Sequence, residues 1–285
     1  MSVPERVGVI GGGRMGAGIA HAFALAGAEV IVVERDAEAA AAASARLLES
    51  VRRSVERGAT DRDVDALRSA IETSTDAAAL AGCRLVVEAV PEERDAKIAA
   101  LSRAEQVLSP DAALATNTSS ISIDDLATAL ARPERFLGLH FFNPVPASQL
   151  VEVVTGAATE PGLVDDATTW IAALGKTPIV VRDSPGFASS RLGVALGLEA
   201  IRMLEEGVAS AADIDAAMTL GYRHPMGPLR TTDIVGLDVR LGIAEELERT
   251  LGERFAAPEL LRRMVAEGKL GRKSGEGFYA WNEER

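Results

Sequence analysis

His140 and Glu152 are the two residues of this sequence best suited to proton chemistry. His140 closes the apolar run 136–140, and Glu152 lies inside a second apolar run, 150–154. Imidazole exchanges a proton near neutral pH, so His140 could take the proton of an alcohol whose carbon gives up a hydride. A carboxylate among aliphatic side chains is costly to bury alone, and we expect His140 to be its partner. We therefore predict a general-base dyad in which Glu152 fixes the tautomer of His140. The alternative is that His140 is a hydrogen-bonded core histidine.

A glycine pattern follows the first expected strand, 6–10, and precedes a helical segment. Gly11 permits a tight turn, Gly13 lets the backbone approach a pyrophosphate, and Gly16 allows close packing of helix on strand. The amide groups and the dipole of the helix N-terminus favour phosphate binding. The pattern predicts a dinucleotide site whose residues are Gly11, Gly12, Gly13, Arg14, Met15 and Gly16.

Glu34 comes directly after the next expected strand, 29–33, about eighteen residues beyond Gly16. A carboxylate at this place can bind the ribose hydroxyls of NAD and repel the 2′-phosphate of NADP, although Arg35 could weaken the repulsion. We therefore predict NAD as the cofactor. The alternative is that Glu34 is an ordinary surface acid.

These residues need a sheet to position them, and the pattern up to about residue 183 provides one. Short β-branched runs alternate with Ala/Leu-rich helical stretches, which is typical of βαβ units and a parallel sheet. The expected strands are 6–10, 29–33, 84–89, 112–116, 136–140, 150–154 and 178–182. We predict an α/β protein with an N-terminal Rossmann-type, mostly parallel sheet, a helical-hairpin insertion at 37–70 and a smaller all-α C-terminal domain.

The domain boundary is expected at the segment 183–187, because no useful β-branched run follows it. A chain of 285 residues exceeds the size that one core usually supports, so two domains are the natural expectation. We predict an NAD-binding domain at 1–184 and a helical substrate and dimerisation domain at 185–285. The apolar residues from Leu192 to Leu204 exceed what one surface helix buries, which favours a homodimer through this domain.

Composition excludes several classes of protein. A net charge of −12 and a pI near 4.9 argue against a nucleic-acid partner, which requires clustered basic charge. The single cysteine, Cys83, permits no intrachain disulfide and no multi-cysteine metal site, so we expect no metal and a reducing, cytoplasmic setting. The N-terminus shows no secretory signal, and no run of about eighteen apolar residues is present, so we expect no membrane span.

Beyond these local patterns, the sequence resembles the 3-hydroxyacyl-CoA dehydrogenase family, close to bacterial 3-hydroxybutyryl-CoA dehydrogenases. The resemblance covers nearly the whole chain. It is carried by the segments 11–18, 87–92 (VEAVPE), 116–120 (TNTSS), 140–146 (HFFNPVP), 150–153 (LVEV), 185–187 (PGF) and 275–279 (GEGFY).

The resemblance implies oxidation of an L-3-hydroxyacyl-CoA, of short chain such as 3-hydroxybutyryl-CoA, to a 3-oxoacyl-CoA with NAD. His140 would be the base, Glu152 would orient it, and Ser119 would hydrogen-bond the reacting oxygen. The implied cofactor contacts are Glu34, Glu92, Lys97, Ser119, Asn143 and Lys273. The implied substrate contacts are Ser50, Arg57, Ser119 and Asn143.

For the CoA moiety the resemblance points to the insertion at 37–70. Its basic side chains could pair with phosphates; they are Arg46, Arg52, Arg53 and Arg57. The alternative is that they form a solvated helix face. The lysines Lys97 and Lys273 have the same alternative.

One position departs from the family pattern. The asparagine that helps to orient the substrate carbonyl is replaced by Ser190. Serine keeps a donor but has a shorter reach, so a bridging water or an altered substrate position would have to compensate.

Two other functions remain open from the sequence. The chain could be an NAD-dependent dehydrogenase of a small sugar acid such as L-gulonate, or a cofactor-binding protein that has lost turnover. The arginines of the insertion favour the CoA substrate over the sugar acid, and the intact pair of His140 and Glu152 argues against the loss of turnover.

Overall fold

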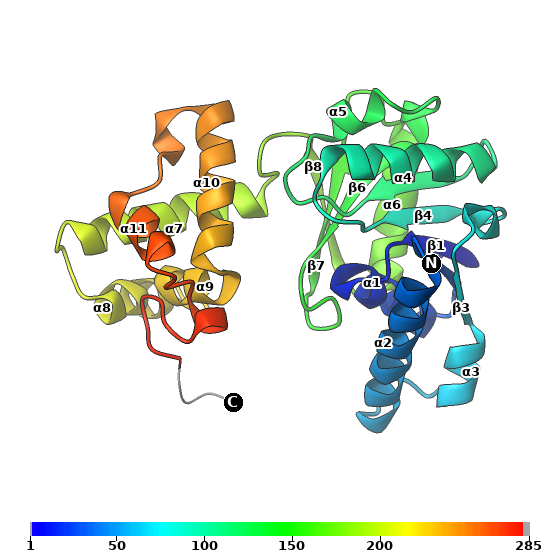
Figure 1. Ribbon diagram of the computed structural model, residues 1–285, viewed down its shortest axis with the longest axis horizontal. Coiled ribbons are helices and arrows are strands. Elements are labelled where there is room, and N and C mark those ends of the chain that lie inside the picture. Colours follow the sequence, from blue (N-terminus) through cyan, green and yellow to red (C-terminus); the bar gives the residue numbers. More distant parts are fainter. Residues whose placement is uncertain (1, 282–285) are drawn as a thin grey trace. The chain divides into compact units, whose positions relative to one another are not determined.

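The computed structural model describes residues 2–281 and divides the chain into two compact units, Met1–Asp183 and Ser184–Arg285. Blue to green colours mark the first unit in Figure 1, and yellow to red colours mark the second. The first unit contains an eight-stranded sheet flanked by helices, and the second is helical. Both observations confirm the predicted fold class. Among the described residues, no helix has the length and apolar character needed to cross a membrane.

The sheet has the order β3-β2-β1-β4-β5-β6-β7-β8, and only the pairing of β6 with β7 is antiparallel. Its strands are β1 (Arg6–Ile10), β2 (Glu29–Val33), β3 (Ile71–Ser74), β4 (Leu85–Glu88), β5 (Ala113–Thr116), β6 (Phe136–Phe141), β7 (Leu150–Thr155) and β8 (Thr177–Arg182). The first six follow the strand order of the Rossmann fold, in which ligands bind where the order reverses, between β1 and β4.

Seven of the eight strands lie where the sequence predicts them, within two residues at either end. The prediction missed β3, because its sequence Ile-Glu-Thr-Ser is polar and short. As an edge strand, β3 pairs only with β2 and needs no continuous apolar run. The predicted insertion ends where β3 begins.

Helices cover the sheet of the first unit. They are α1 (Arg14–Leu25), α2 (Ala37–Glu56), α3 (Val64–Ser69), α4 (Arg94–Val107), α5 (Ile123–Ala127) and α6 (Pro161–Ala173). The insertion consists of α2 and the short α3, and each begins at an aspartate, Asp36 or Asp63, whose carboxylate accepts a hydrogen bond from a first-turn amide.

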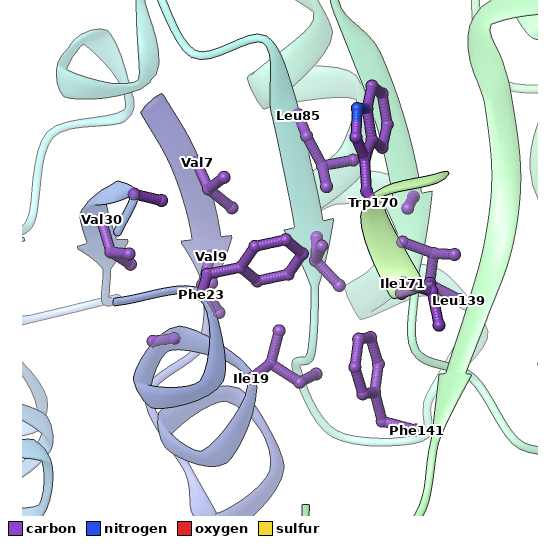
Figure 2. Packing of buried hydrophobic residues seen from close by; sticks show 14 of the residues in the cluster. Val7, Val9, Ile19, Phe23, Val30, Leu85, Leu139, Phe141, Trp170 and Ile171 are labelled. Carbon is purple, nitrogen blue, oxygen red and sulfur yellow. The ribbon is translucent and has the colours of Figure 1, made fainter. Parts of the chain in front are cut away.

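Aliphatic and aromatic side chains form the core between the sheet and two of these helices. Figure 2 shows Ile19 and Phe23 of α1 and Trp170 and Ile171 of α6 packed against the strands near Leu85. The two helices thus press on the same face of the sheet. Because both faces of a parallel sheet are buried, its strands are nearly continuous in Val, Leu and Ile.

The second unit packs its own core from five helices. They are α7 (Ser189–Glu205), α8 (Ala211–Ala216), α9 (Pro228–Val235), α10 (Leu237–Leu251) and α11 (Glu259–Ala266). Asp233 of α9 is fully buried and accepts hydrogen bonds from the amides of Phe278 and Tyr279 and from the indole of Trp281, at 2.8–2.9 Å. This carboxylate fixes the last described segment against the helices.

Candidate active site

The sheet brings His140 and Glu152 directly opposite each other. They form one register pair of the antiparallel strands β6 and β7, so both side chains lie on the same face of the sheet. Nδ1 of His140 lies 2.6 Å from Oε2 of Glu152, and the two side chains are 7% and 0% exposed. The ring of Phe142 packs at 4.4 Å from the imidazole. This geometry suits a carboxylate that accepts a hydrogen bond from Nδ1–H and leaves Nε2 as the basic nitrogen.

A second buried acid, Glu88, stands at the carboxyl end of β4. Its carboxylate accepts hydrogen bonds from Thr116 Oγ1 at 2.6 Å, from the amide of Val90 at 2.6 Å and from Lys97 Nζ at 2.9 Å. Lys97 is 1% exposed, and its ammonium also lies 3.2 Å from Glu92 Oε2. The ammonium therefore joins two carboxylates inside the unit. A cofactor contact by Lys97 stays a prediction.

Glu92 organises the loop that carries Ser119. Its Oε1 accepts hydrogen bonds from the hydroxyl of Thr118 at 2.6 Å, the amide of Ser119 at 2.8 Å and the amide of Ser120 at 3.1 Å. Burial by itself would raise the pKa of Glu92, but the Lys97 ammonium and these donors hold it below its usual value. The carboxylate is thus a stable anion, and the Ser119 hydroxyl lies 3.3 Å from it.

The glycine turn sits between β1 and α1 as predicted. A Cβ atom at Gly16 would lie 1.7 Å from the carbonyl oxygen of Gly11, so only glycine fits there. A Cβ atom at Gly13 would meet nothing within 4 Å, so the space beside the turn is open. Gly13 is also the N-cap of α1, and no side chain caps this helix end. Its first-turn amides are therefore available to a phosphate.

A cavity of about 760 Å³ lies beside this turn and has the size of a cofactor pocket. Glu34 lines it, and the Glu34 carboxylate accepts a hydrogen bond from the amide of Gly12 at 2.6 Å. Arg46 of α2 also lines the cavity and donates to the carbonyl of Gly12 at 2.5 Å. The open turn, the uncapped helix and the acid at the end of β2 together fit a dinucleotide. Arg14 and Met15 line the same cavity.

The basic residues of α2 are arranged in a stripe that starts at this cavity. Spacings of four, three and four residues place on one helix face Arg46, Ser50, Arg53 and Arg57. Ser50 donates its hydroxyl to the carbonyl of Arg46, and Arg53 forms an ion pair with Glu49 at 2.8 Å. Arg57 is the exposed C-cap residue of the helix. Arg52 lies off the stripe.

Three further predicted site residues lie outside the sheet. Asn143 is exposed in the loop between β6 and β7. Ser190 is the second residue of α7 and Lys273 pairs with Asp238 at 2.6 Å, both in the second unit. The structure therefore gathers at one edge of the sheet the glycine turn, Glu34, Glu92, Ser119, His140 and Glu152.

The sequence analysis predicted no role for Glu88 or Asn117, which position other residues of the site. Asn117 Oδ1 accepts the amide hydrogen of Phe141 at 2.8 Å and so ties the Ser119 loop to the end of β6. A signal for Glu88 was present, because it is a carboxylate at the end of an apolar strand, as Glu152 is within one. Asn117 gave no such signal.

A dinucleotide turn, an acid for the ribose and a buried imidazole–carboxylate pair at the same sheet edge define a nicotinamide-dependent dehydrogenase. Comparison with known proteins identifies which kind. Residues 6–184 match the NAD binding domain of 3-hydroxyacyl-CoA dehydrogenase, and residues 186–281 match its C-terminal domain.

Relatives span nearly the whole chain. The 3-hydroxybutyryl-CoA dehydrogenase of Mycobacterium tuberculosis is 42% identical over 97% of this chain and 98% of its own length. The crystal structure of (S)-3-hydroxybutyryl-CoA dehydrogenase from Ralstonia eutropha is 38% identical and superposes with a TM-score of 0.92 over 98% of this chain and 99% of that one. A diketoreductase that acts on dicarbonyl compounds is 30% identical, with a TM-score of 0.86 over 98% of this chain and all of the other. The chain belongs to the 3-hydroxyacyl-CoA dehydrogenase family and is an NAD-dependent oxidoreductase.

The position of Glu34 leads to a prediction on cofactor choice. Glu34→Ala should raise kcat/KM for NADPH relative to NADH by about tenfold or more, because the repelling carboxylate is gone and Arg46 remains in the cavity. Steady-state kinetics with both cofactors measure the ratio. Glu38→Gln, an exposed acid in the first turn of α2, is the matched control. An unchanged ratio would remove Glu34 from cofactor discrimination.

Proposed function

We propose that this protein oxidises L-3-hydroxyacyl-CoA esters of short chain, such as 3-hydroxybutyryl-CoA, to 3-oxoacyl-CoA esters with NAD. The observation that carries the proposal is the buried His140–Glu152 pair, 2.6 Å apart, at the sheet edge that also holds the glycine turn. Relatives named 3-hydroxybutyryl-CoA dehydrogenase support the substrate class.

In this proposal His140 transfers one proton, and Ser119 binds the reacting oxygen of the substrate. NAD, when bound, supplies the acceptor for the hydride from C3 of the substrate. His140 takes the hydroxyl proton at Nε2, and Glu152 stabilises the resulting imidazolium through Nδ1–H. The Ser119 hydroxyl donates a hydrogen bond to the reacting oxygen. In the reductive direction, His140 returns the same proton.

The α2 stripe of Arg46, Ser50, Arg53 and Arg57 would hold the phosphates of CoA. Arginine forms bidentate hydrogen bonds with phosphate, and the stripe is exposed over most of its length. The acidic protein thus offers a local basic strip to an anionic substrate.

Reduction of 3-oxoacyl-CoA esters with NADH is the direct test. Acetoacetyl-CoA and longer 3-oxoacyl-CoA esters are supplied in parallel, with NADPH and free 3-oxo acids as controls. We expect short CoA esters to be reduced with NADH far faster than the free acids. Comparable rates for the ester and the free acid would contradict the proposal.

A second candidate is a dehydrogenase of a free hydroxy acid such as L-gulonate. The similarity to a diketoreductase favours it, because that relative is named for dicarbonyl compounds. Oxidation of L-gulonate with NAD, without activity on CoA esters, would select this candidate.

We also propose that the protein is a homodimer through its helical unit. Large exposed apolar side chains concentrate there; they are Leu192, Val208, Leu220, Tyr222, Val235 and Val239. Exposed apolar side chains of this size suit burial against a second copy of the chain. We expect sedimentation at micromolar concentration to give about twice the 29.8 kDa of one chain. A monomeric mass would contradict the proposal.

We also propose that the protein is cytoplasmic. Cys83, the single cysteine, is buried, and burial raises the pKa of its thiol to about 11. A thiol with so high a pKa is a poor nucleophile. As the single cysteine it cannot form a disulfide within the chain, which suits a reducing compartment such as the cytoplasm. Activity in the soluble fraction of lysed cells is the expected observation.

A further inference from the structure

The loop 142–149 joins the strands of His140 and Glu152, and it is fixed on both sides of Asn143. Asn143 itself is exposed. Two residues before it, the amide of Phe141 donates a hydrogen bond to Oδ1 of Asn117 at 2.8 Å. Two residues after it, Val145 is 2% exposed and belongs to the core of the first unit. The main chain that carries Asn143 therefore runs between two anchors.

The side chain of Val145 packs on α1. A Cβ atom at Gly18 would lie 2.9 Å from both Cβ and Cγ2 of Val145, so the missing side chain of Gly18 makes room for the loop. Gly18 comes two residues after Gly16, where α1 leaves the glycine turn. The loop that follows β6 thus rests on the helix whose N-terminal amides are available to a phosphate.

Lys176 holds the main chain of the same loop. Its Nζ atom donates hydrogen bonds to the carbonyl oxygen of Val145 at 2.6 Å and to that of Ser148 at 2.5 Å. Burial lowers the pKa of Lys176, because both acceptors are neutral and do not offset the loss of water around the charge. Hydrogen bonds from an ammonium are stronger than those between neutral groups. One side chain therefore fixes two carbonyl groups three residues apart.

The backbone of Lys176 is itself held rigidly. Gly175 ends α6 with φ +72°, and the amide of Lys176 donates to the carbonyl of Ile171 at 3.3 Å, as in a Schellman motif. The next residue, Thr177, donates its amide to the carbonyl of Gln149 at 2.6 Å, where the loop ends. The ammonium group thus extends from a fixed helix end to the middle of the loop.

We propose that Lys176 is a positioning residue that holds Asn143 in place for the reaction at His140. The inference rests on the proposed function, with Asn143 in the cofactor and substrate contacts predicted for it. Lys176 acts through the main chain of the loop: without its ammonium, the carbonyls of Val145 and Ser148 lose their donor. Asn143 then keeps only the anchor at Phe141 and the packing of Val145. A misplacement of about 1 Å can lower turnover by about a hundredfold.

The first test measures kcat and KM for acetoacetyl-CoA with NADH in the wild-type protein, Lys176→Met and Lys176→Arg. We expect Lys176→Met to lower kcat/KM by about tenfold or more. Lys176→Arg should keep more activity, because it retains the charge and the donors. NADH binding and a melting temperature near that of the wild-type protein show that Lys176→Met is folded. Arg182→Met, which removes an exposed cation at the far end of β8, is the matched control and should keep the wild-type value.

A double-mutant cycle separates positioning of Asn143 from a purely structural role. Two residues that act through one contact have non-additive effects, whereas independent residues have additive ones. We therefore expect Lys176→Met to have little further effect on kcat/KM once Asn143→Ala is present. Gly18→Ala displaces Val145 from the side of α1, so it should lower kcat/KM and show the same dependence on Asn143.

The same fold loss from Lys176→Met with and without Asn143→Ala would overturn the proposal. So would a wild-type kcat/KM in either single variant. If Lys176→Met does not fold, Gly18→Ala in the two backgrounds decides by the same criterion. A wild-type protein that reduces no CoA ester would refute the proposed function instead. The cycle is then measured with L-gulonate and NAD, where additive effects of Lys176→Met and Asn143→Ala would overturn the positioning role.

Discussion

His140→Ala is expected to lower kcat for acetoacetyl-CoA reduction by about a thousandfold, within the range found for loss of a general acid or base. No other described side chain is placed on β6 to exchange the proton, because its neighbours Leu139 and Phe141 are apolar. The affinity for NADH, measured by fluorescence titration, should change little, since the glycine turn follows β1 and Glu34 follows β2, away from β6.

Ser190→Ala provides the comparison for this variant. A serine has a shorter reach than the asparagine of the family pattern, so we expect Ser190→Ala to keep measurable activity while His140→Ala loses most of it. Equal losses of kcat in the two variants would show that Ser190 has fully taken over the role of the asparagine. A His140→Ala variant with more than about a tenth of wild-type kcat would place the base elsewhere.

Glu152→Gln should lower kcat by well over tenfold, on the order of a hundredfold, while NADH still binds. Glutamine has nearly the same shape, but it carries no charge to stabilise the imidazolium and its amide can donate to Nδ1, which favours the wrong tautomer. The effect should fall on kcat, because the carboxylate is fully buried behind the imidazole. Presteady-state reduction of acetoacetyl-CoA with NADH isolates the chemical step.

Glu72→Gln serves as the control for this variant. Glu72 is an exposed acid on β3 of the same sheet, and its substitution should leave kcat unchanged. A melting temperature close to that of the wild-type protein shows that Glu152→Gln is folded. If the folded variant turns over at the wild-type rate, Glu152 has no part in the mechanism.

The sequence predicts the frame of the site well, because its signals are local. The strands β1 and β2 carry dense apolar runs, and the glycine pattern between β1 and α1 has a steric reason at Gly11, Gly12 and Gly16, whereas Gly13 faces open space. The edge strand β3 lacks such a run, so no periodicity indicates it. Helices and strands that bury a continuous apolar face are therefore predictable, and edges are less so.

The sequence predicts only in part that His140 and Glu152 lie opposite each other on neighbouring strands. The connection between β6 and β7 has eight residues, 142–149, whereas a crossover between parallel strands needs a dozen or more. The short connection therefore implies an antiparallel pair, although the alternation of elements suggests parallel strands. The register that places the two residues opposite each other depends on three-dimensional packing.

Tertiary contacts also bury two cationic side chains, Lys97 and Arg240, that look like ordinary surface residues in the sequence. Lys97 reads as a helix lysine, and its burial against Glu88 appears only when β4 and α4 are packed. Arg240 likewise reads as one arginine of an amphipathic helix. Its burial beside Gly193 and Gly197, more than forty residues away in the chain, appears only when α7 and α10 are packed.

The proposed proton-transfer pair, His140 and Glu152, lies on two strands that are hydrogen-bonded to each other, whereas Ser190 belongs to a separately packed helical unit. Substitutions in the core of the helical unit are therefore expected to leave the register of His140 and Glu152 unchanged.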